Sequence, residues 1–225
     1  MKSVFETDDI GRLIVEFRDD ITAFDGGKKD VMTGKGRCNA AVSSFFFQYL
    51  ENQGVKTHFI GMIDETRMVV RRLQMIPLEV IVRNYAAGSL VRNYPFKEGQ
   101  KLNPSLVVLD YKDDSRHDPM INDEIVGALG IATPKELKTI KETALAINRH
   151  LSLYLAGQGI TLVDFKLEFG RAGKTIYVGD EISMDSMRLW DKKTKESLDK
   201  DVYRSGKGDV MATYTRVLQR ICKVE

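Results

Sequence analysis

The feature that most constrains the fold is an alternating run, LVDFKLEFG, at positions 162–170. In it, apolar residues at 163, 165, 167 and 169 alternate with Asp164, Lys166 and Glu168. A period of two is that of a β-strand with one apolar and one polar face. A solvated surface strand shows the same pattern, and for these three charges alone we favour that interpretation. Same-face neighbours lie about 7 Å apart, so the three charges could instead reach one ligand.

A second strand with acidic residues follows this run. A glycine-containing turn comes after Gly170, and the chain then reaches Asp180 and Glu181. These two have opposite strand parity, so only one can share the face of Glu168, depending on whether the turn holds an odd or even number of residues. Two facing carboxylates repel unless a cation lies between them. Mg²⁺ bound by one or two carboxylates plus substrate phosphates has that geometry, which indicates a nucleoside triphosphate site.

Length and charge limit the possible partners. The 225 residues suit one large or two small domains. With 34 basic and 32 acidic side chains, the chain lacks a polybasic footprint, so we expect no nucleic-acid partner. Apolar runs are far shorter than the roughly 20 residues that span a bilayer, so we expect no membrane association. Cys38 and Cys222 lack metal-ligand spacing and no signal-peptide pattern opens the chain, which together predict a cytoplasmic location.

The first 73 residues predict a small antiparallel sheet with one helix. Two strands separated by TDDIG are expected within 1–24. A helix is expected to begin after Gly36 and to end at Gly54, and three short strands should follow, the last at 78–82.

The remainder predicts a long irregular segment and two further helices. Residues 84–122 are rich in Gly, Pro, Asn and Asp, and loops of such length are usually functional. The clearest helix has Thr133 as N-cap, Pro134 at its first position and Glu136 at N3, keeps a 3.6-residue apolar period, and ends at Gly157. A last helix is expected at 209–222.

A candidate phosphate site occurs in IPLEVIVRNYAAGS. Glu79, Ile81 and Arg83 share one strand face, and Arg83 is followed by a turn in which Gly88 permits close backbone approach and Ser89 offers a hydroxyl. A guanidinium beside backbone amides is a common phosphate-binding arrangement. Strands followed by Gly-Ser turns are frequent, so this segment alone leaves phosphate binding open.

Other charged residues carry weaker signals. In DYKDDSRHDPMIN, Pro119 biases Asp118 toward an extended conformation that would hold its carboxylate out from a loop. His117 is not expected to bind metal, because neither other histidine offers ligand spacing. Lys112 could be an ordinary loop lysine, and Arg204, which follows an acidic, strand-like segment, is by itself surface charge.

Together these segments resemble the family of SAICAR synthetases, or phosphoribosylaminoimidazole-succinocarboxamide synthases. The resemblance rests on IPLEVIVRNYAAGS, HDPM, LVDFKLEFG followed by GDEIS, and DSMRLWDKKT with KDVYR, in the family's order over essentially the whole chain. It implies an α+β fold. Residues 1–75 would form an N-terminal ATP-binding lobe (antiparallel sheet plus helix) resembling the small lobe of protein kinases. Residues 76–225 would form a larger ATP-grasp-like lobe with the ribonucleotide and metal site, and ATP would bind between the lobes.

The resemblance also implies the reaction. Such enzymes join the carboxylate of 5-amino-1-(5-phosphoribosyl)imidazole-4-carboxylate to the amine of L-aspartate, giving SAICAR, ADP and phosphate in purine (IMP) biosynthesis. A carboxylate is a poor acyl electrophile, so ATP first converts it to an acyl phosphate, with charge neutralised by Mg²⁺ and lysines. ATP and Mg²⁺ are therefore the expected cofactors. The expected partners are small-molecule substrates and a second copy of the chain in a homodimer.

By resemblance, each candidate residue receives a role. The implied metal ligands are Glu168 and Asp180, with Lys2 and Lys112 near the ATP phosphates. The ribonucleotide 5′-phosphate would be bound by Arg83, Ser89 and Arg204, and the ribose, base and carboxylate would be surrounded by Asp118, Asp164, Lys166, Asp185 and Arg188. The catalytic residues would be Lys112, Asp164 and Lys166. If Asp180 rather than Glu181 faces Glu168, the hairpin turn must be odd-numbered or bulged.

One departure concerns the N-terminus. Family members usually begin with a strand and a glycine-lysine loop, GKAK, whereas MKSVFETDD matches only its second lysine, at Lys2. The first strand and this loop thus look truncated, through either a misplaced start or an incomplete phosphate lid. We expect this difference to weaken ATP binding more than ribonucleotide binding.

Two rival interpretations are considered. A small-molecule or protein kinase is disfavoured because no H-R-D loop is present, and because Lys166 rather than glycine follows Asp164-Phe165. A nucleotide-binding regulatory protein that has lost the chemistry is the other. ADP release that requires both the ribonucleotide and L-aspartate would separate the ligase from that rival.

Overall fold

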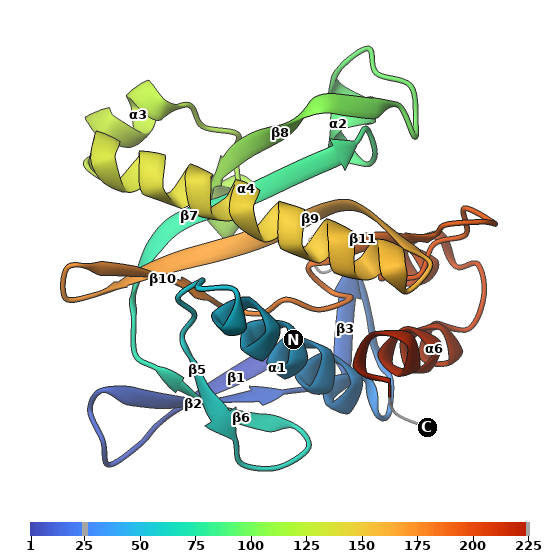
Figure 1. The fold of residues 1–225 in the computed structure, drawn as a ribbon, viewed down its shortest axis with the longest axis horizontal. Coiled ribbons are helices and arrows are strands. Elements are labelled where there is room, and N and C mark those ends of the chain that lie inside the picture. Colours follow the sequence, from blue (N-terminus) through green and yellow to red (C-terminus); the bar gives the residue numbers. More distant parts are fainter. Residues whose placement is uncertain (24–26, 224–225) are drawn as a thin grey trace.

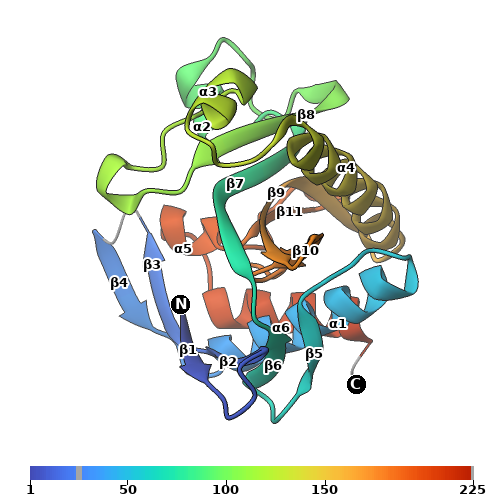
Figure 2. The same cartoon turned by 90° about the vertical axis from the view of Figure 1, so that its left-hand side faces the viewer.

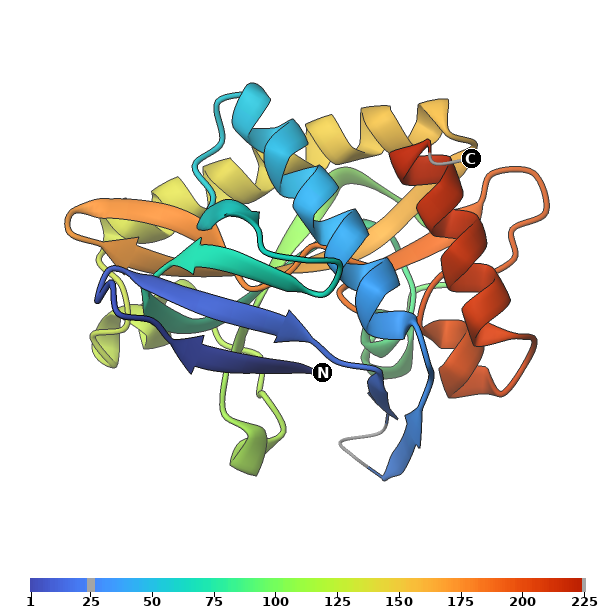
Figure 3. The same ribbon diagram turned by 90° about the horizontal axis from the view of Figure 1, so that it is seen from below.

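The computed structural model describes residues 1–23 and 27–223 and has a mixed α+β fold (Figure 1). Its first part is a four-stranded antiparallel sheet in the order β1-β2-β6-β5. The strands are β1 (Lys2–Glu6), β2 (Arg12–Phe17), β5 (Phe59–Met62) and β6 (Arg67–Arg71). Helix α1 (Lys35–Asn52) crosses this sheet (Figure 3), which confirms the prediction of a small sheet with one helix. Strands β3 (Asp20–Ala23) and β4 (Lys28–Val31) form a separate two-stranded ribbon.

Helix α1 begins slightly earlier than the sequence predicted. The Asp19 carboxylate accepts hydrogen bonds from the backbone N–H groups of Gly34 (3.1 Å) and Gly36 (2.9 Å). This satisfies N–H groups that the first helical turn would otherwise leave unpaired. Lys35 therefore lies inside the helix, where its side chain is buried.

The second part is a five-stranded sheet in the order β10-β9-β7-β8, with β11 also paired to β9. All of its pairings are antiparallel. The strands are β7 (Gln74–Tyr85), β8 (Lys101–Tyr111), β9 (Ile160–Ala172), β10 (Thr175–Gly179) and β11 (Met187–Asp191). Strand β9 contains the alternating run, and its hairpin with β10 is as predicted.

Helix α4 (Pro134–Gly157) covers the apolar face of this sheet (Figures 1 and 2). On that face, Val80 lies opposite Leu167 and Val82 opposite Phe165, all of them buried. The predicted capping box is confirmed, because Thr133 Oγ1 accepts from the Glu136 N–H while the Glu136 carboxylate accepts from the Thr133 N–H. With α4 on one face, the charged residues of β7 and β9 lie on the other.

The irregular segment predicted at 84–122 is wrong. It contains the eleven-residue strand β8, as well as α2 (Ser89–Asn93) and a short 3-10 helix, η1 (Asp114–Arg116). Strand β8 is at the edge of the sheet, where Pro104 costs no ladder hydrogen bond to a further strand. The prolines and asparagines of this segment favour a loop, and β8 forms a strand because it pairs with β7.

The C-terminal region packs beside α1. Helix α6 (Val210–Cys222) confirms the helix predicted at 209–222 and lies alongside α1 (Figures 1 and 3). Asp209 is its N-cap. The strand-like segment expected before Arg204 is instead helix α5 (Asp201–Ser205). Its start is fixed by Asp199, whose carboxylate accepts from the N–H groups of Asp201 (2.7 Å) and Leu189 (2.6 Å). Helix α3 (Asp123–Ala128) completes the element set.

Apolar side chains of both halves share one core. Phe46 of α1, Met68 of β6, Leu78 of β7, Leu151 of α4 and Phe165 of β9 belong to the same buried cluster. The division into lobes at residue 75 stays a prediction. Within residues 1–23 and 27–223, no helix combines the length and the apolar character needed to cross a membrane.

Candidate active site

The polar face of β7 and β9 is buried at three of its charged residues and half-buried between them. Arg83 lies directly opposite Asp164, and four residues away Glu79 lies opposite Glu168. Arg83, Asp164 and Glu168 are only 6–7% exposed, so the expectation of a solvated charge ladder is wrong. Buried charges require partners. Two groups of partners, at the two ends of this face, define the candidate active site.

The first group, the arginine end, surrounds Asp164. Arg83 Nη1 lies 3.2 Å and Arg188 Nη1 2.6 Å from the same carboxylate oxygen, Oδ2. Arg83 Nη2 also donates to Ser89 Oγ at 2.9 Å. Burial raises the pKa of Asp164, whereas Arg188 and Arg83 act to lower it. Four residues that the sequence assigned to ribonucleotide binding are thus in contact.

Two further residues extend the arginine end. Arg188 Nε contacts Asp201 Oδ2 at 2.6 Å, and Arg204 Nη1 contacts Asp201 Oδ1 at 2.6 Å. Gly88 fits against this group because a Cβ there would lie 2.7 Å from Arg188 Nη2, and its φ of 59° disfavours other residues. Three guanidinium groups face two carboxylates, so the arginine end has an excess of positive charge.

The second group, the carboxylate end, consists of Glu79 and Glu168 with two lysines. Lys112 Nζ lies 3.3 Å from Glu79 Oε1 and 3.1 Å from Glu168 Oε1. Lys166 Nζ contacts the same two oxygens, at 3.3 Å for Glu168. Burial lowers the pKa of Lys166, but Glu168 and Glu79 have the larger effect and raise it overall. Burial likewise lowers the pKa of Lys112, and Glu168 helps to raise it above its ordinary value. Both lysines are therefore held as cations.

Lys2 connects the first sheet to the segment after β10. Its Nζ lies 2.5 Å from Asp180 Oδ1 and 2.7 Å from Glu181 Oε1. Burial lowers the pKa of Lys2, while Glu181 and Asp180 raise it by more. A residue of β1 thus neutralises both acids that the sequence left as alternatives.

The prediction of an odd-numbered or bulged hairpin turn is wrong. Thr175 lies opposite Ala172, so the turn contains only Gly173 and Lys174, and the register is unbroken up to Gly179, opposite Glu168. Gly173 has the positive φ (58°) that such a tight turn needs. By pairing parity this register favours Glu181, not Asp180, on the face of Glu168.

Strand alternation does not fix the faces of Asp180 and Glu181, because β10 ends before them. Strand β10 stops at Gly179, and Asp180 has a left-handed φ of 58°. The direction of the Asp180 side chain is therefore set by this backbone turn and by its contact with Lys2, not by strand alternation.

Two predicted site residues lie in separate contacts. Asp118 has a φ of 44°, so its predicted extended conformation is wrong. Its carboxylate accepts a hydrogen bond from the Asp113 N–H (2.7 Å). This hydrogen bond closes a turn, and the turn outweighs the conformational preference imposed by Pro119. The Asp185 carboxylate accepts from Lys35 Nζ and from Tyr214 Oη, both at 2.7 Å. Burial raises and Lys35 lowers the pKa of Asp185, which is about 2 overall.

Sequence reasoning missed several partners. Glu79 was recognised as sharing a face with Arg83, and that parity could have identified it as a partner of the β9 charges. Asp201 is three residues before Arg204, the spacing of a helical ion pair, but the sequence pattern there predicts a strand. Lys35 gave no signal, because it was placed before the helix that buries it.

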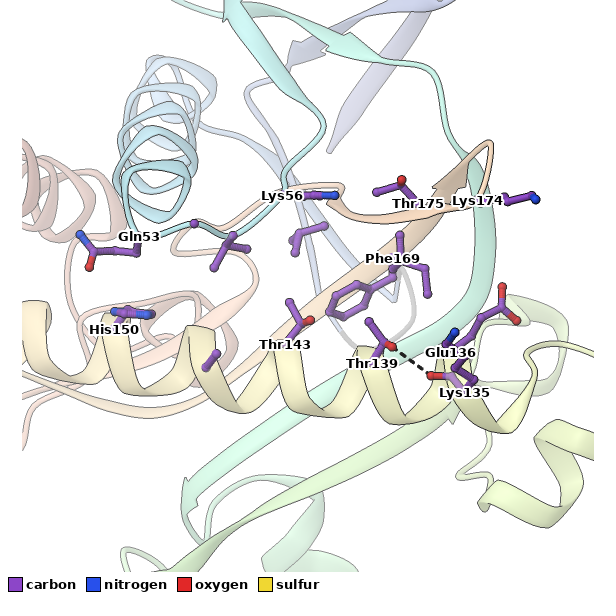
Figure 4. A pocket seen from close by; sticks show the side chains of 15 residues that line it. Gln53, Lys56, Lys135, Glu136, Thr139, Thr143, His150, Phe169, Lys174 and Thr175 are labelled. Carbon is purple, nitrogen blue, oxygen red and sulfur yellow. Dashed lines mark hydrogen bonds between the residues drawn. The ribbon is translucent and has the colours of Figure 1, made fainter.

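A separate cavity of about 610 Å³ lies between α4, β10 and the segment that follows α1 (Figure 4). Phe169 lines it together with Thr139 and Thr143 of α4. Phe169 follows Glu168 in β9, so the two side chains point to opposite faces. None of the residues assigned from the sequence lines this cavity, so it is not part of the candidate active site.

Known proteins resemble this chain over nearly its whole length. The family model described as SAICAR synthetase matches residues 1–221. A phosphoribosylaminoimidazole-succinocarboxamide synthase of Methanoregula boonei is 74% identical over 222 residues, which are 99% of this chain and 87% of the relative. The crystal structure of SAICAR synthetase from Pyrococcus horikoshii is 50% identical, with a TM-score of 0.96 over 100% of this chain and 99% of that one. A SAICAR synthetase structure in complex with ADP is also 50% identical, with a TM-score of 0.97 over 100% and 96% of the two chains.

The fold, the charged face and these relatives define an enzyme of the ATP-dependent ligase class. The chain belongs to the SAICAR synthetase family, whose reaction is a step of purine biosynthesis.

Proposed function

We propose that the enzyme joins the carboxylate of 5-amino-1-(5-phosphoribosyl)imidazole-4-carboxylate to the amine of L-aspartate through an acyl phosphate, forming SAICAR, ADP and phosphate. The observation that carries this proposal is the division of one sheet face into an arginine end and a carboxylate end. Such a face can hold a phosphate at one end and keep a reacting carboxylate beside lysines at the other.

The arginine end is the proposed ribonucleotide site. Arg83, Ser89 and Arg204 bind the 5′-phosphate, because guanidinium forks match phosphate oxygens. The excess of positive charge at the arginine end is available to an anionic ligand. Arg83 Nε is buried without a hydrogen-bond partner among the described residues, and it is a donor that a ligand can occupy. The ribose, base and carboxylate are assigned to Asp118, Asp164, Lys166, Asp185 and Arg188.

The carboxylate end is the proposed ATP side. Lys2 and Lys112 lie near the ATP phosphates, and the ADP complex of a 50% identical relative supports nucleotide binding. We place the adenine near residues 73–76, because this segment lies beside Gly179, the residue before Asp180. A Cβ on Gly179 would lie 3.3 Å from Leu73 Cδ1 and 3.4 Å from Met75 Cε. ATP would then bind between a kinase-like lobe (1–75) and an ATP-grasp-like lobe (76–225). The contact of Lys2 with Asp180 would join the two lobes.

Glu168 and Asp180 are the proposed Mg²⁺ ligands. The described residues contain no group of three or more side chains arranged to hold a metal ion. Hard carboxylate oxygens next to a nucleotide site fit Mg²⁺, which is usually held by one or two carboxylates, phosphates and water. When bound, the ion would neutralise charge on the transferring phosphoryl group.

Lys112, Lys166 and Asp164 are the proposed catalytic residues. The two lysines already lie between carboxylates, so they can neutralise an anionic substrate that joins this cluster. Asp164 fixes the guanidinium groups of Arg83 and Arg188, and thereby the orientation of the ribonucleotide.

ADP release tests the proposal. We expect rapid ADP formation only when ATP, Mg²⁺, the carboxyaminoimidazole ribonucleotide and L-aspartate are all present, with SAICAR identified by mass spectrometry. Omission of each substrate in turn provides the controls. Binding of ATP and ribonucleotide without turnover would instead support a regulatory protein that has lost the chemistry.

Two broader features belong to the same proposal. We place the enzyme in a reducing cytoplasm, where the free thiols of Cys38 and Cys222 would stay reduced. Light scattering during size-exclusion chromatography tests the proposed homodimer, which should have twice the 25.5 kDa chain mass.

A further inference from the structure

Three carboxylates form a row across the charged face. Asp110 of β8 lies directly opposite Glu79 of β7, and Glu79 lies directly opposite Glu168 of β9. Like charges in directly opposed positions of a sheet repel. Such a row therefore costs stability wherever cations do not compensate it.

The lysines compensate two of the three carboxylates. Lys112 and Lys166 both contact Glu79 and Glu168. Within residues 1–23 and 27–223, no hydrogen bond or ion pair reaches the carboxylate of Asp110, which is half-buried. Asp110 therefore carries the surplus negative charge of the row.

The charged groups around Asp110 come from three parts of the chain. They are Glu79 and Arg83 of β7, Asp118 of the loop after η1, and Lys166 of β9. Burial and Glu79 raise the pKa of Asp110 to about 6, against the opposing effect of Arg83. Asp110 is thus mainly ionised at neutral pH, but it can take up a proton more readily than an ordinary aspartate.

The proposed reaction brings one cationic group to this site. L-Aspartate carries an ammonium group that must lose a proton before its nitrogen can attack. We propose, on the basis of the proposed function, that Asp110 is a further catalytic residue that binds the ammonium group of L-aspartate together with Glu79 and accepts a proton from it. Lys166, which contacts Glu79, places this pair beside the proposed position of the ribonucleotide carboxylate.

The protons balance in this step. One N–H bond of the ammonium group breaks, its proton forms an O–H bond on Asp110, and the electron pair stays on nitrogen. That pair then forms the C–N bond to the acyl carbon while the C–O bond to phosphate breaks. The second proton lost from nitrogen leaves with the phosphate as HPO₄²⁻, and Asp110 later releases its proton to water.

A nucleophile that needs no base provides the test. Hydroxylamine is largely unprotonated at neutral pH and attacks acyl phosphates. At pH 7.5, ADP formation is measured with ATP, Mg²⁺ and the ribonucleotide, using either L-aspartate or hydroxylamine. For Asp110→Asn we expect kcat/KM for L-aspartate to fall about 100-fold, the usual effect of losing a general base, with hydroxylamine-dependent ADP formation retained.

Two variants serve as controls. Asp114→Asn changes an exposed aspartate of η1, and both nucleophiles should react as in the wild type. Asp110→Glu keeps a carboxylate and should recover part of the L-aspartate activity, which a merely structural role would not predict.

The outcomes separate this inference from the proposed function. If the wild type forms no ADP with either nucleophile, the proposed function fails. Equal losses with both nucleophiles in Asp110→Asn, or restoration of its rate by excess Mg²⁺, would overturn the role of Asp110 as a base. Retention of the full L-aspartate rate would overturn it as well.

Discussion

The two ends of the charged face use the same strands for opposite electrostatics. At the arginine end, Arg83 of β7 faces Asp164 of β9; four residues away, at the carboxylate end, Glu79 faces Glu168. Four residues of strand span about 13 Å. The sheet thus fixes two charged regions, which we propose as binding regions, at a set separation and without any loop between them.

The partners of the two ends also differ. Guanidinium groups at the arginine end hold carboxylates in fixed directions, as when Arg188 reaches both Asp164 and Asp201. At the carboxylate end, Lys112 and Lys166 are single-point cations shared between acids. Rigid forks suit the positioning of a phosphate, whereas shared lysines can turn toward a charge that develops during reaction. Substitutions at the two ends should therefore affect different kinetic constants.

The largest expected effect is at the arginine end. Arg83→Ala leaves Asp164 buried with one guanidinium fewer, so the free energy of unfolding should fall by about 3–5 kcal/mol. Loss of charge-assisted hydrogen bonds to phosphate should raise KM for the ribonucleotide by roughly 30-fold, about 2 kcal/mol, with KM for ATP little changed. Denaturant titration and steady-state kinetics measure both effects. Arg37→Ala, at a side chain 63% exposed, should change neither; a rise in KM for ATP instead would place Arg83 at the wrong end.

Glu168→Gln should have the next largest effect. It removes a charge from the proposed Mg²⁺ site while leaving Glu79 to pair with both lysines. We expect kcat to fall about 100-fold, as when a preorganised electrostatic contact is lost. KM for the ribonucleotide should change little. Glu142→Gln, which removes a glutamate from an exposed ion pair with Lys138, is the matched control. Normal turnover in Glu168→Gln would exclude Glu168 from phosphoryl transfer.

The pattern of local signals explains what the sequence could predict. The capping box at Thr133 is a local feature, and strand alternation placed Arg83, Asp164 and Glu168 on their faces. The hairpin register was not predictable, because it depends on the two-residue turn at Gly173. The position of Asp110 opposite Glu79 was not predictable for a different reason, since β8 is defined by its pairing with β7 and not by its own pattern.

Lys2→Met tests whether the first sheet belongs to the carboxylate end. Lys2 is the cation between Asp180 and Glu181, and both acids would lose their partner. We expect KM for ATP to rise about tenfold, or 1.4 kcal/mol, because a charge near the phosphates is lost. KM for the ribonucleotide should stay the same. Lys29→Met, at an exposed position of β4, is the control. An equal rise in KM for both substrates would argue for general destabilisation.

The smallest expected effect concerns pH and stability at Asp110, which lies opposite Glu79 of the carboxylate end. Because the pKa of Asp110 is raised to about 6, the folded state binds a proton that the unfolded state has already lost between about pH 4 and 6. This contribution to stability is full below the unfolded-state pKa and is lost as pH rises through 6. Asp185, with its pKa lowered to about 2 by Lys35, contributes in the opposite sense and loses its contribution only in strong acid.

Asp110→Asn should therefore stabilise the protein at pH 8 but not at pH 4. Since Asp110 is partly exposed, we discount the effect to about 1 kcal/mol, which corresponds to a Tm difference of about 2–4 °C for a chain of this size. Calorimetry at the two pH values measures it. A variant that is less stable than the wild type at pH 8 would show that Asp110 has a compensating partner, and the surplus negative charge beside the carboxylate end would then not exist. A gain in stability with a loss of L-aspartate turnover would show that the uncompensated acid is kept for reaction and not for folding.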